Sequence, residues 1–289
     1  MKNFVLLIIG LTASLFLVSL SFGDQPKTNT TTSTTASTTT ASTTTNSVIV
    51  SESTKITTKE TTVNTSHITT DRPSFTTDSK TIESNHYQLE LGYVYQDLDH
   101  GDANNIPNSS LRYGLDNNCE LRLGWNGYSF RSEGDDVISG TDLGFKYRFM
   151  DQSKDPISLA FIHTFTLPTG NADGVGYEFL FGWNYDVNSN TSLSGNLGLG
   201  VPVDLETDDH FAQGIASVKL QKELDAANGV FGEYYTNFPA ADNEDAEHVL
   251  QTGLTHRFND NFQVDGVVGV GLNDQAPEWL LGVGFGYRF

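Results

Sequence analysis

The sequence contains a single cysteine, Cys119, among 289 residues. One cysteine excludes an internal disulfide, and its position far from the N-terminus excludes the lipid-modified residue of a lipoprotein. Basic residues are also scarce: 16 Lys and Arg stand against 36 Asp and Glu, which gives a formal net charge of -20. Because nucleic-acid binding requires a basic surface, this balance excludes nucleic acid as a partner.

Long apolar runs are absent except for one, Phe4–Leu20. It follows Lys2 and is followed by small residues, a pattern that predicts a secretory signal peptide over residues 1–23 with cleavage after Gly23. An uncleaved membrane anchor is the alternative. No other stretch is apolar over the roughly 20 residues that a spanning helix needs, so any further membrane crossing must use strands.

Residues 24–70 are rich in Thr and Ser and contain few aliphatic or aromatic side chains. Such a segment buries too little apolar surface to offset the entropy of ordering, so we predict a disordered linker. A glycosylated stalk is the alternative, because NTT and NTS match the N-glycosylation pattern.

From residue 85 to residue 289, segments of about ten residues alternate apolar and polar side chains between turns rich in Asp, Asn, Gly and Pro. The last one, EWLLGVGFGYRF at 278–289, places aromatic and aliphatic side chains on one face and mainly glycines on the other. We count about twelve such segments, within the even strand numbers usual for bacterial outer-membrane barrels. Hydrophobic content of 37% permits this fold, since only one face of each strand meets lipid.

The connections between these segments alternate in length. Short turns such as DNN and NDN alternate with longer acidic connections, which include 97–108, 131–139, 202–210 and 239–246. This alternation is typical of an up-and-down barrel with periplasmic turns and extracellular loops. The predicted fold is therefore all-β: a transmembrane antiparallel barrel of about twelve strands in the outer membrane of a Gram-negative cell, with the linker in the periplasm. The barrel is expected to bind the lipid bilayer of the outer membrane, with girdles of aromatic side chains at both membrane surfaces.

Several motifs in the same order resemble one bacterial family. They are TDRPSF followed by the first strand, CELRLGW, LGFKYRF, LPTG, FGEYY and GLNDQAPEWLLGVGFGYRF, and together they extend from Thr70 to Phe289. The sequence resembles the outer-membrane transporter family named after the meta-pathway of phenol degradation. The resemblance implies a barrel that passes small molecules, with aromatic or hydrophobic compounds as the class its name suggests. Phe289 also resembles the terminal signal that the barrel-assembly machinery recognises, which implies that machinery as a partner.

Charged side chains of both signs are predicted to line the lumen: Glu90, Arg112, Glu120, Arg122, Asp142, Lys146, Arg148, Glu178, Lys219, Glu233, Arg257, Asp265 and Arg288. One interpretation is a narrow polar conduit, and the other is an ion-pair network that fills the barrel. Arg122, Asp142 and Lys146 are expected to share one polar layer. Residues 71–84 are predicted to form a plug at the periplasmic mouth, with a mere extension of the linker as the alternative.

No catalytic residue, metal or cofactor is predicted. The strand histidines lack the Ser and acidic neighbours of a catalytic triad, and the rim residues His100, His210 and Asp208 lack the spacing of metal ligands. Two functions remain: passive or gated passage of small molecules, and a closed barrel that acts as a surface structural or adhesion protein. The sequence assigns neither a solute nor an oligomeric state.

Overall fold

The computed structural model describes residues 67–289, except for residue 206 and residues 241–244. The predicted signal peptide and nearly all of the predicted linker lie outside the described residues. Regular secondary structure in the described part is entirely β. No helix among these residues is long and apolar enough to cross a membrane.

Fourteen antiparallel strands form the described sheet. Their bounds are β1 Tyr87–Leu98, β2 Gly101–Gly114, β3 Cys119–Trp125, β4 Tyr128–Arg131, β5 Val137–Ile138, β6 Thr141–Met150, β7 Ser158–Leu167, β8 Gly176–Asn188, β9 Thr191–Val201, β10 Gln213–Glu223, β11 Asn228–Pro239, β12 Glu247–Asn259, β13 Phe262–Gly271 and β14 Trp279–Arg288.

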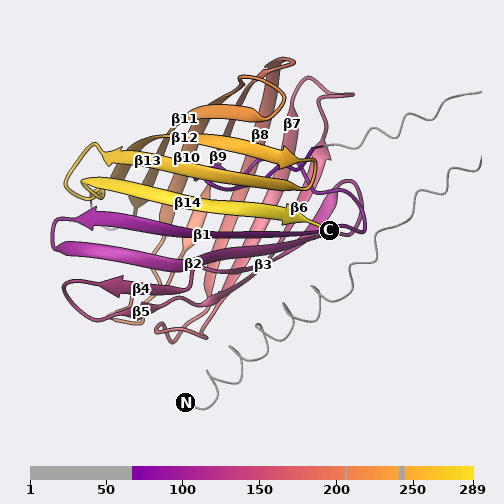
Figure 1. The fold of residues 1–289 in the computed structure, drawn as a ribbon. Helices are drawn as coiled ribbons and strands as arrows, with labels where there is room; N and C mark the ends of the chain where they lie inside the picture. Colours follow the sequence, from indigo (N-terminus) through magenta and orange to yellow (C-terminus); the bar gives the residue numbers. More distant parts are fainter. Residues whose placement is uncertain (1–66, 206, 241–244) are drawn as a thin grey trace, which may run out of the picture. The chain divides into compact units, whose positions relative to one another are not determined.

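The sheet closes because β1 pairs with both β2 and β14, so the first and last strands of the chain lie side by side (Figure 1). Strands β4 and β5 form a side hairpin: β2 pairs with β4 through Ala103–Ile106 and with β3 through Ser109–Gly114. The other twelve described strands make an up-and-down barrel. The predicted fold is confirmed. Closure leaves the twelve-strand barrel without a free edge, which lipid could not satisfy.

Alternation along each strand separates an inner face from an outer face. On β14, Leu280 is 5% exposed while its neighbour Leu281 is 44% exposed. The outer apolar side chains therefore form the surface that contacts lipid. We call the end where β1 begins and β14 ends the terminal end, and the opposite end the loop end. A continuous series of ring contacts crosses the terminal end from β2 to β12, through Tyr113, Tyr87, Phe289, Tyr287, Phe262 and Phe258.

Two predicted loops contain strand instead. The prediction of a loop over 97–108 is wrong, because β1 extends to Leu98 and β2 begins at Gly101. The segment 131–139 includes β5, which pairs with β4. The polar sequence concealed the first hairpin. Asn105 donates a hydrogen bond to Gln96 at 3.1 Å, so polar side chains pair across strands that carry no apolar alternation.

Phe289 joins the terminal end of the barrel wall. It exchanges two backbone hydrogen bonds of 2.9 Å with Tyr87 and stacks on the rings of Tyr87 and Tyr287. We expect deletion of Phe289 to lower the amount of folded barrel in outer membranes severalfold, while Phe289→Tyr, which keeps the ring and the backbone, should assemble normally. The folded fraction is read from unheated against boiled gel samples. Equal yields of the deletion variant and the wild type would remove this role.

Candidate functional site: a plugged lumen

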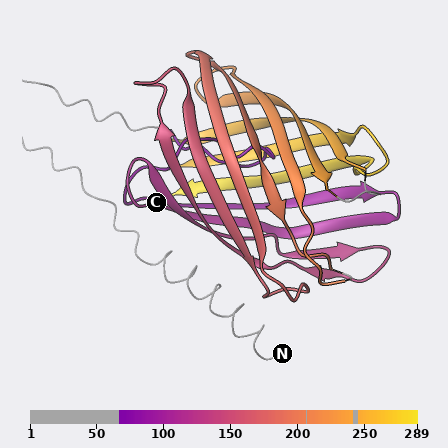
Figure 2. The same cartoon turned by 180° about the vertical axis from the view of Figure 1, so that it is seen from behind.

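Residues 67–86, here called the plug segment, enter and leave the barrel at the terminal end. The Ile68 amide donates to the Asp260 carbonyl at 2.8 Å, and the Asn85 amide donates to the Gly114 carbonyl at 2.8 Å. Between these points the segment reaches the middle of β9, where the Thr77 amide donates to the Asn196 side chain at 2.8 Å. In Figure 2 it is the indigo trace between the strands. The segment thus loops into the lumen and returns to the same end.

The bounds of this segment differ from the predicted ones. Residues 67–70 were predicted to belong to the linker, but Ile68 is 1% exposed and the Thr69 carbonyl accepts a hydrogen bond from Gln88 at 2.9 Å. The prediction placed the plug at the mouth of the barrel, but the segment extends past the mouth into the lumen, as far as Asn196 on β9. Thr and Ser side chains of the segment form hydrogen bonds with the barrel wall, for example Thr76 with Ser217. A composition rich in Thr and Ser, which predicted disorder, is therefore compatible with a segment that is ordered inside a polar lumen.

Carboxylates of the barrel wall bind the backbone of the plug segment. Glu90 accepts hydrogen bonds from the amides of Asp71 and Arg72 at 3.1 and 3.0 Å. Glu233 accepts them from the amides of Phe75 and Thr76 at 2.9 and 2.6 Å. A segment without strand pairing must find acceptors elsewhere for its buried amides. The inward acids supply those acceptors and fix the path of the segment.

Asp71 lies between three cations of the wall. Its carboxylate is 2.6 Å from Arg122, 3.5 Å from Arg112 and 3.4 Å from Lys146. Burial by itself would raise the pKa of Asp71, but the attraction of Arg112, Lys146 and Arg122 outweighs it and holds that pKa well below its usual range. The carboxylate is therefore ionised at any physiological pH.

The wall around Asp71 carries one more positive charge than negative charge. Its cations are Arg112, Arg122 and Lys146, and the acids bonded to them are Glu90 and Glu120. Arg112 and Arg122 are also direct partners across β2 and β3, an arrangement that is unfavourable for like charges. Asp71 brings the cluster to three charges of each sign. The plug segment thus completes the neutralisation of a buried part of the wall.

Phe75 anchors the tip of the plug segment on an apolar part of the lumen. Its ring stacks on Tyr235 with centroids 4.1 Å apart and planes 3° apart. Two buried clusters of wall side chains contact it: Phe231, Tyr235, Val249, Val267, Ala276 and Leu280, and Ile162, Leu180 and Ile215. The lumen residues predicted from the sequence are all charged and do not include this apolar part. The alternation of side chains along β11 could have identified this apolar part, because Phe231 and Tyr235 lie two residues before and two residues after the inward Glu233.

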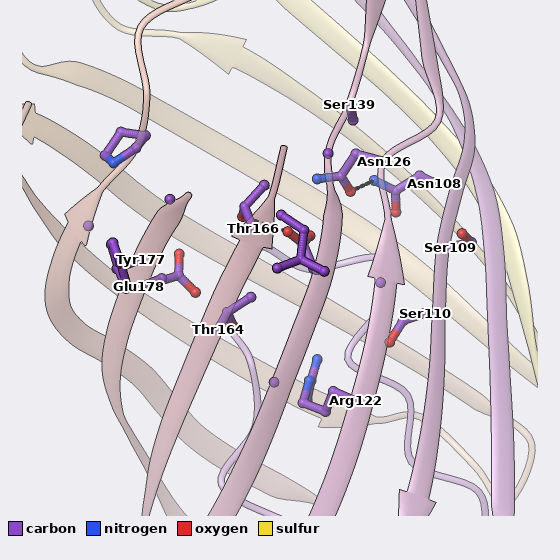
Figure 3. Close-up of a pocket in the computed structure, with 18 of the residues that line it drawn as sticks. Asn108, Ser109, Ser110, Arg122, Asn126, Ser139, Thr164, Thr166, Tyr177 and Glu178 are labelled. Carbon is purple, nitrogen blue, oxygen red and sulfur yellow. Dashed lines mark hydrogen bonds between the residues drawn. The ribbon is translucent and has the colours of Figure 1, made fainter. Parts of the chain in front are cut away.

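Two cavities lie on the two sides of the plug segment. The outer cavity, of about 690 Å³, opens toward the loop end and has Asp71, Arg72 and Phe75 among its lining residues. Arg122 and Glu178 point into it from different strands (Figure 3). The inner cavity, of about 510 Å³, opens toward the terminal end and is lined by Lys219 and Arg257, among others. Arg72 and Ser74 border both cavities. The plug segment is therefore the partition between them.

Residues 70–289 match the family model described as "Putative MetA-pathway of phenol degradation". The chain belongs to this family. No curated protein matches the sequence. Among solved structures, it is similar to an outer membrane channel from Pseudomonas putida F1, with 11% identity, a TM-score of 0.57, and coverage of 75% of this chain and 100% of that one. It also matches the Pseudomonas putida toluene transporter TodX, with 11% identity, a TM-score of 0.39, and coverage of 73% and 90%. The first likeness supports the barrel fold of this family member.

Five of the charged residues expected in the lumen gather around Asp71: Glu90, Arg112, Glu120, Arg122 and Lys146. Asp142 lies elsewhere. It accepts a hydrogen bond from Thr166 at 2.6 Å and lines the outer cavity, as Glu178 does. The pairing of β3 with β6 sets Lys146 opposite Glu120 but Asp142 opposite Gly124, four residues further toward the loop end. Of the three residues expected in one polar layer, Arg122 and Lys146 lie together because both pair with Asp71. Asp142 lies closer to the loop end and is not part of that layer.

The remaining expected residues contact the plug segment or the terminal turns. Lys219 donates to the Ser74 hydroxyl at 2.9 Å, and Asp265 pairs with Arg72 at 3.4 Å. Three arginines lie near the terminal end: Arg148 pairs with Asp151, Arg257 with Glu223, and Arg288 donates to Asn261. The described residues include no cluster of three or more His, Cys, Asp or Glu placed to bind a metal ion.

Proposed function

We propose that the protein is an outer-membrane channel for small molecules whose lumen the plug segment closes in this structure. The observation that carries the proposal is the pair of cavities, about 690 and about 510 Å³, at the two ends of one barrel with the same short segment between them. A barrel filled permanently by its own wall would have no such vestibules. In this proposal the terminal end faces the periplasm and the loop end faces the outside.

The contacts of the plug segment suit a part that can move. The two ends are fixed by backbone hydrogen bonds and by the buried side chains of Ile68 and Ile82. Between them the contacts are mainly ion pairs and hydrogen bonds from wall side chains to a backbone without strand pairing, together with the aromatic anchor Phe75. Water can replace each polar contact, and the twelve-strand ladder does not depend on any of them. Release of the segment would join the two cavities into one path without opening the wall.

Aromatic or hydrophobic compounds are the solute class that family membership supports. The loop end of the outer cavity has an apolar part, formed by Val137, Ile138, Leu167, Val203 and Leu205. Charged groups lie deeper, at the plug segment. A solute with an apolar body could therefore enter while its polar group points toward Arg122.

Acidic outer loops would add a weak preference for cations at low salt, over the roughly 8–10 Å screening length. We propose no enzymatic activity and propose that assembly uses Phe289 as its signal.

Removing residues 67–84 should convert a closed barrel into an open one. We expect the full chain to give rare, brief openings in planar bilayers and the shortened chain to give sustained conductance, because the partition between the cavities is gone. Heat-dependent gel migration of the shortened protein provides the control for folding. A folded, shortened barrel that never conducts would favour the runner-up function, a closed structural or adhesion protein.

A further inference from the structure

We propose that Arg112, Arg122 and Lys146 form a binding site for a carboxylate, which the plug segment occupies with its own Asp71. Small organic monocarboxylates with an apolar body would compete with Asp71 for this site. The proposal rests on the proposed channel function, since it names the solute class of the same lumen and the event that opens it.

The site has the properties of a built anion pocket. The side chains of Arg112 and Lys146 are 2% and 0% exposed. Together with Arg122 they make three positive charges against two neighbouring wall acids, Glu90 and Glu120, which leaves a surplus of one. A buried surplus charge is unfavourable unless an anion is present. Asp71 meets this need but belongs to a segment held mainly by polar contacts. Any other carboxylate that reached the same three cations would satisfy the wall equally well.

A route to the site exists from the outer cavity. Arg122 is the least buried of the three cations, with 16% of its side chain exposed, and it lines that cavity. Figure 3 shows its side chain pointing into the cavity below Thr164 and Thr166. Its Nη1 donates to both Asp71 and Glu120. A guanidinium has five N–H donors, so it can bind an incoming carboxylate while Asp71 leaves, and exchange need not expose the bare cation to an empty cavity.

Two acids on the approach narrow the solute class. Asp142 and Glu178 line the same cavity, on β6 and β8. They repel anions, and the repulsion grows with each negative charge on the solute. The pocket without Asp71 has a surplus of one positive charge, so one carboxylate neutralises it. A tricarboxylate would bring two further negative charges that the pocket does not balance, and all three of its charges are repelled on the way. The apolar part of the outer cavity, with Ile138 and Leu205, favours a carboxylate attached to a hydrophobic ring or chain.

Binding at this pocket would be coupled to opening. A solute that binds only when Asp71 has left stabilises the released plug segment by mass action. Asp71 thus acts as an internal competitor that keeps the lumen closed until a suitable solute arrives. The same three cations would then form the first binding site on the path through the barrel.

Exposure of the plug segment can be measured without conductance. Ser79 is fully buried, and its hydroxyl has no hydrogen-bond partner in the described part of the chain, so Ser79→Cys in a Cys119→Ser background is a mild probe. We would follow maleimide labelling of this full-length variant in lipid vesicles with benzoate, benzamide or citrate. We expect benzoate to raise the labelling rate by about tenfold, which equals a shift of about 1.4 kcal/mol. Benzamide, the neutral isostere, and citrate should have little effect.

Two further variants connect the effect to the pocket. In Arg122→Gln the ratio of rates with and without benzoate should fall toward one, and in Asp71→Asn benzoate should add nothing, because the competitor is already absent. No acceleration by benzoate, equal acceleration by benzamide, or an unchanged ratio in Arg122→Gln would overturn the carboxylate site. These outcomes are independent of the channel proposal. A folded plug-deleted barrel that never conducts would refute the channel while leaving the labelling result intact.

Discussion

Replacing Asp71 by Asn should release the plug segment and open the lumen. The substitution removes one charge at nearly constant volume and leaves three wall cations with two wall acids. Breaking a buried ionic cluster in this way typically costs about 3–5 kcal/mol. We expect sustained conductance in planar bilayers and a large rise in labelling of the Ser79→Cys probe, while the barrel itself stays folded.

Asp78→Asn is the matched control for this change. Asp78 is another buried acid of the plug segment, but its carboxylate accepts a hydrogen bond from the Lys80 amide at 2.8 Å and makes no ion pair among the described residues. It should leave conductance near the wild-type level. Equal opening by both substitutions would show that any loss of charge loosens the segment and that Asp71 has no special part.

The contribution of Asp71 should also have a defined pH dependence. Its folded-state pKa is lowered, so the stabilisation is complete above the unfolded value near 4 and is lost as pH falls through the folded value. Maleimide labelling slows for every variant as pH falls, because only the thiolate reacts, so the two variants are compared by the ratio of their rates. The ratio of the labelling rate of Asp71→Asn to that of wild type should therefore stay constant from about pH 8 to about pH 5. A ratio that falls to one between these values would contradict the assignment of the ion cluster.

Arg112→Met should destabilise the barrel wall more than any other single change in the cluster. Arg112 donates two hydrogen bonds to Glu120, at 2.9 and 2.8 Å, and is the cation paired with Glu90 among the described residues. Its removal leaves Glu90 buried without a cation. We expect a loss of about 3–5 kcal/mol in the free energy of unfolding, measured by urea titration of the barrel in lipid vesicles.

Arg122→Met provides the comparison. Its side chain is partly exposed, and both of its acids, Asp71 and Glu120, keep Arg112 and Lys146 as partners. Its effect on unfolding should be clearly smaller than that of Arg112→Met, while its effect on plug release should be measurable. The opposite order would mean that the wall does not depend on Arg112 for the neutralisation of Glu90.

The barrel was predictable from the sequence because lipid imposes a strict period of two. β14 shows this directly: Leu281, Val283 and Phe285 alternate with glycines, and the structure places Leu281 outward and Leu280 inward. Toward the loop end this pattern ends, as in the hairpin of β1 and β2, where paired strands with a mostly polar sequence look like loop. Strand assignment from alternation is thus reliable only across the part of each strand that meets lipid.

The sequence predicted which charged residues face the lumen, but not which of them contact one another or the plug segment. Parity identified Arg112, Glu120 and Lys146 as inward, but nothing in local sequence connects them to Asp71, which lies 41 residues before Arg112 in sequence (112 minus 71). The apolar seat of Phe75 was missed for a related reason. A plugged lumen has a core of its own, so inward positions such as Phe231 and Tyr235 follow the packing rule of soluble proteins rather than that of a water-filled pore.

A reversible lock on the plug segment tests the central claim most directly. Thr77 and Asn196 exchange two hydrogen bonds, of 2.8 and 2.9 Å, so cysteines at these positions in a Cys119→Ser, Asp71→Asn background would connect the tip of the segment to β9 by a disulfide. We predict that this barrel is silent in planar bilayers when oxidised and conducts in the same membrane after reduction. Equal conductance before and after reduction would contradict the account, because the segment would then not be what closes the lumen.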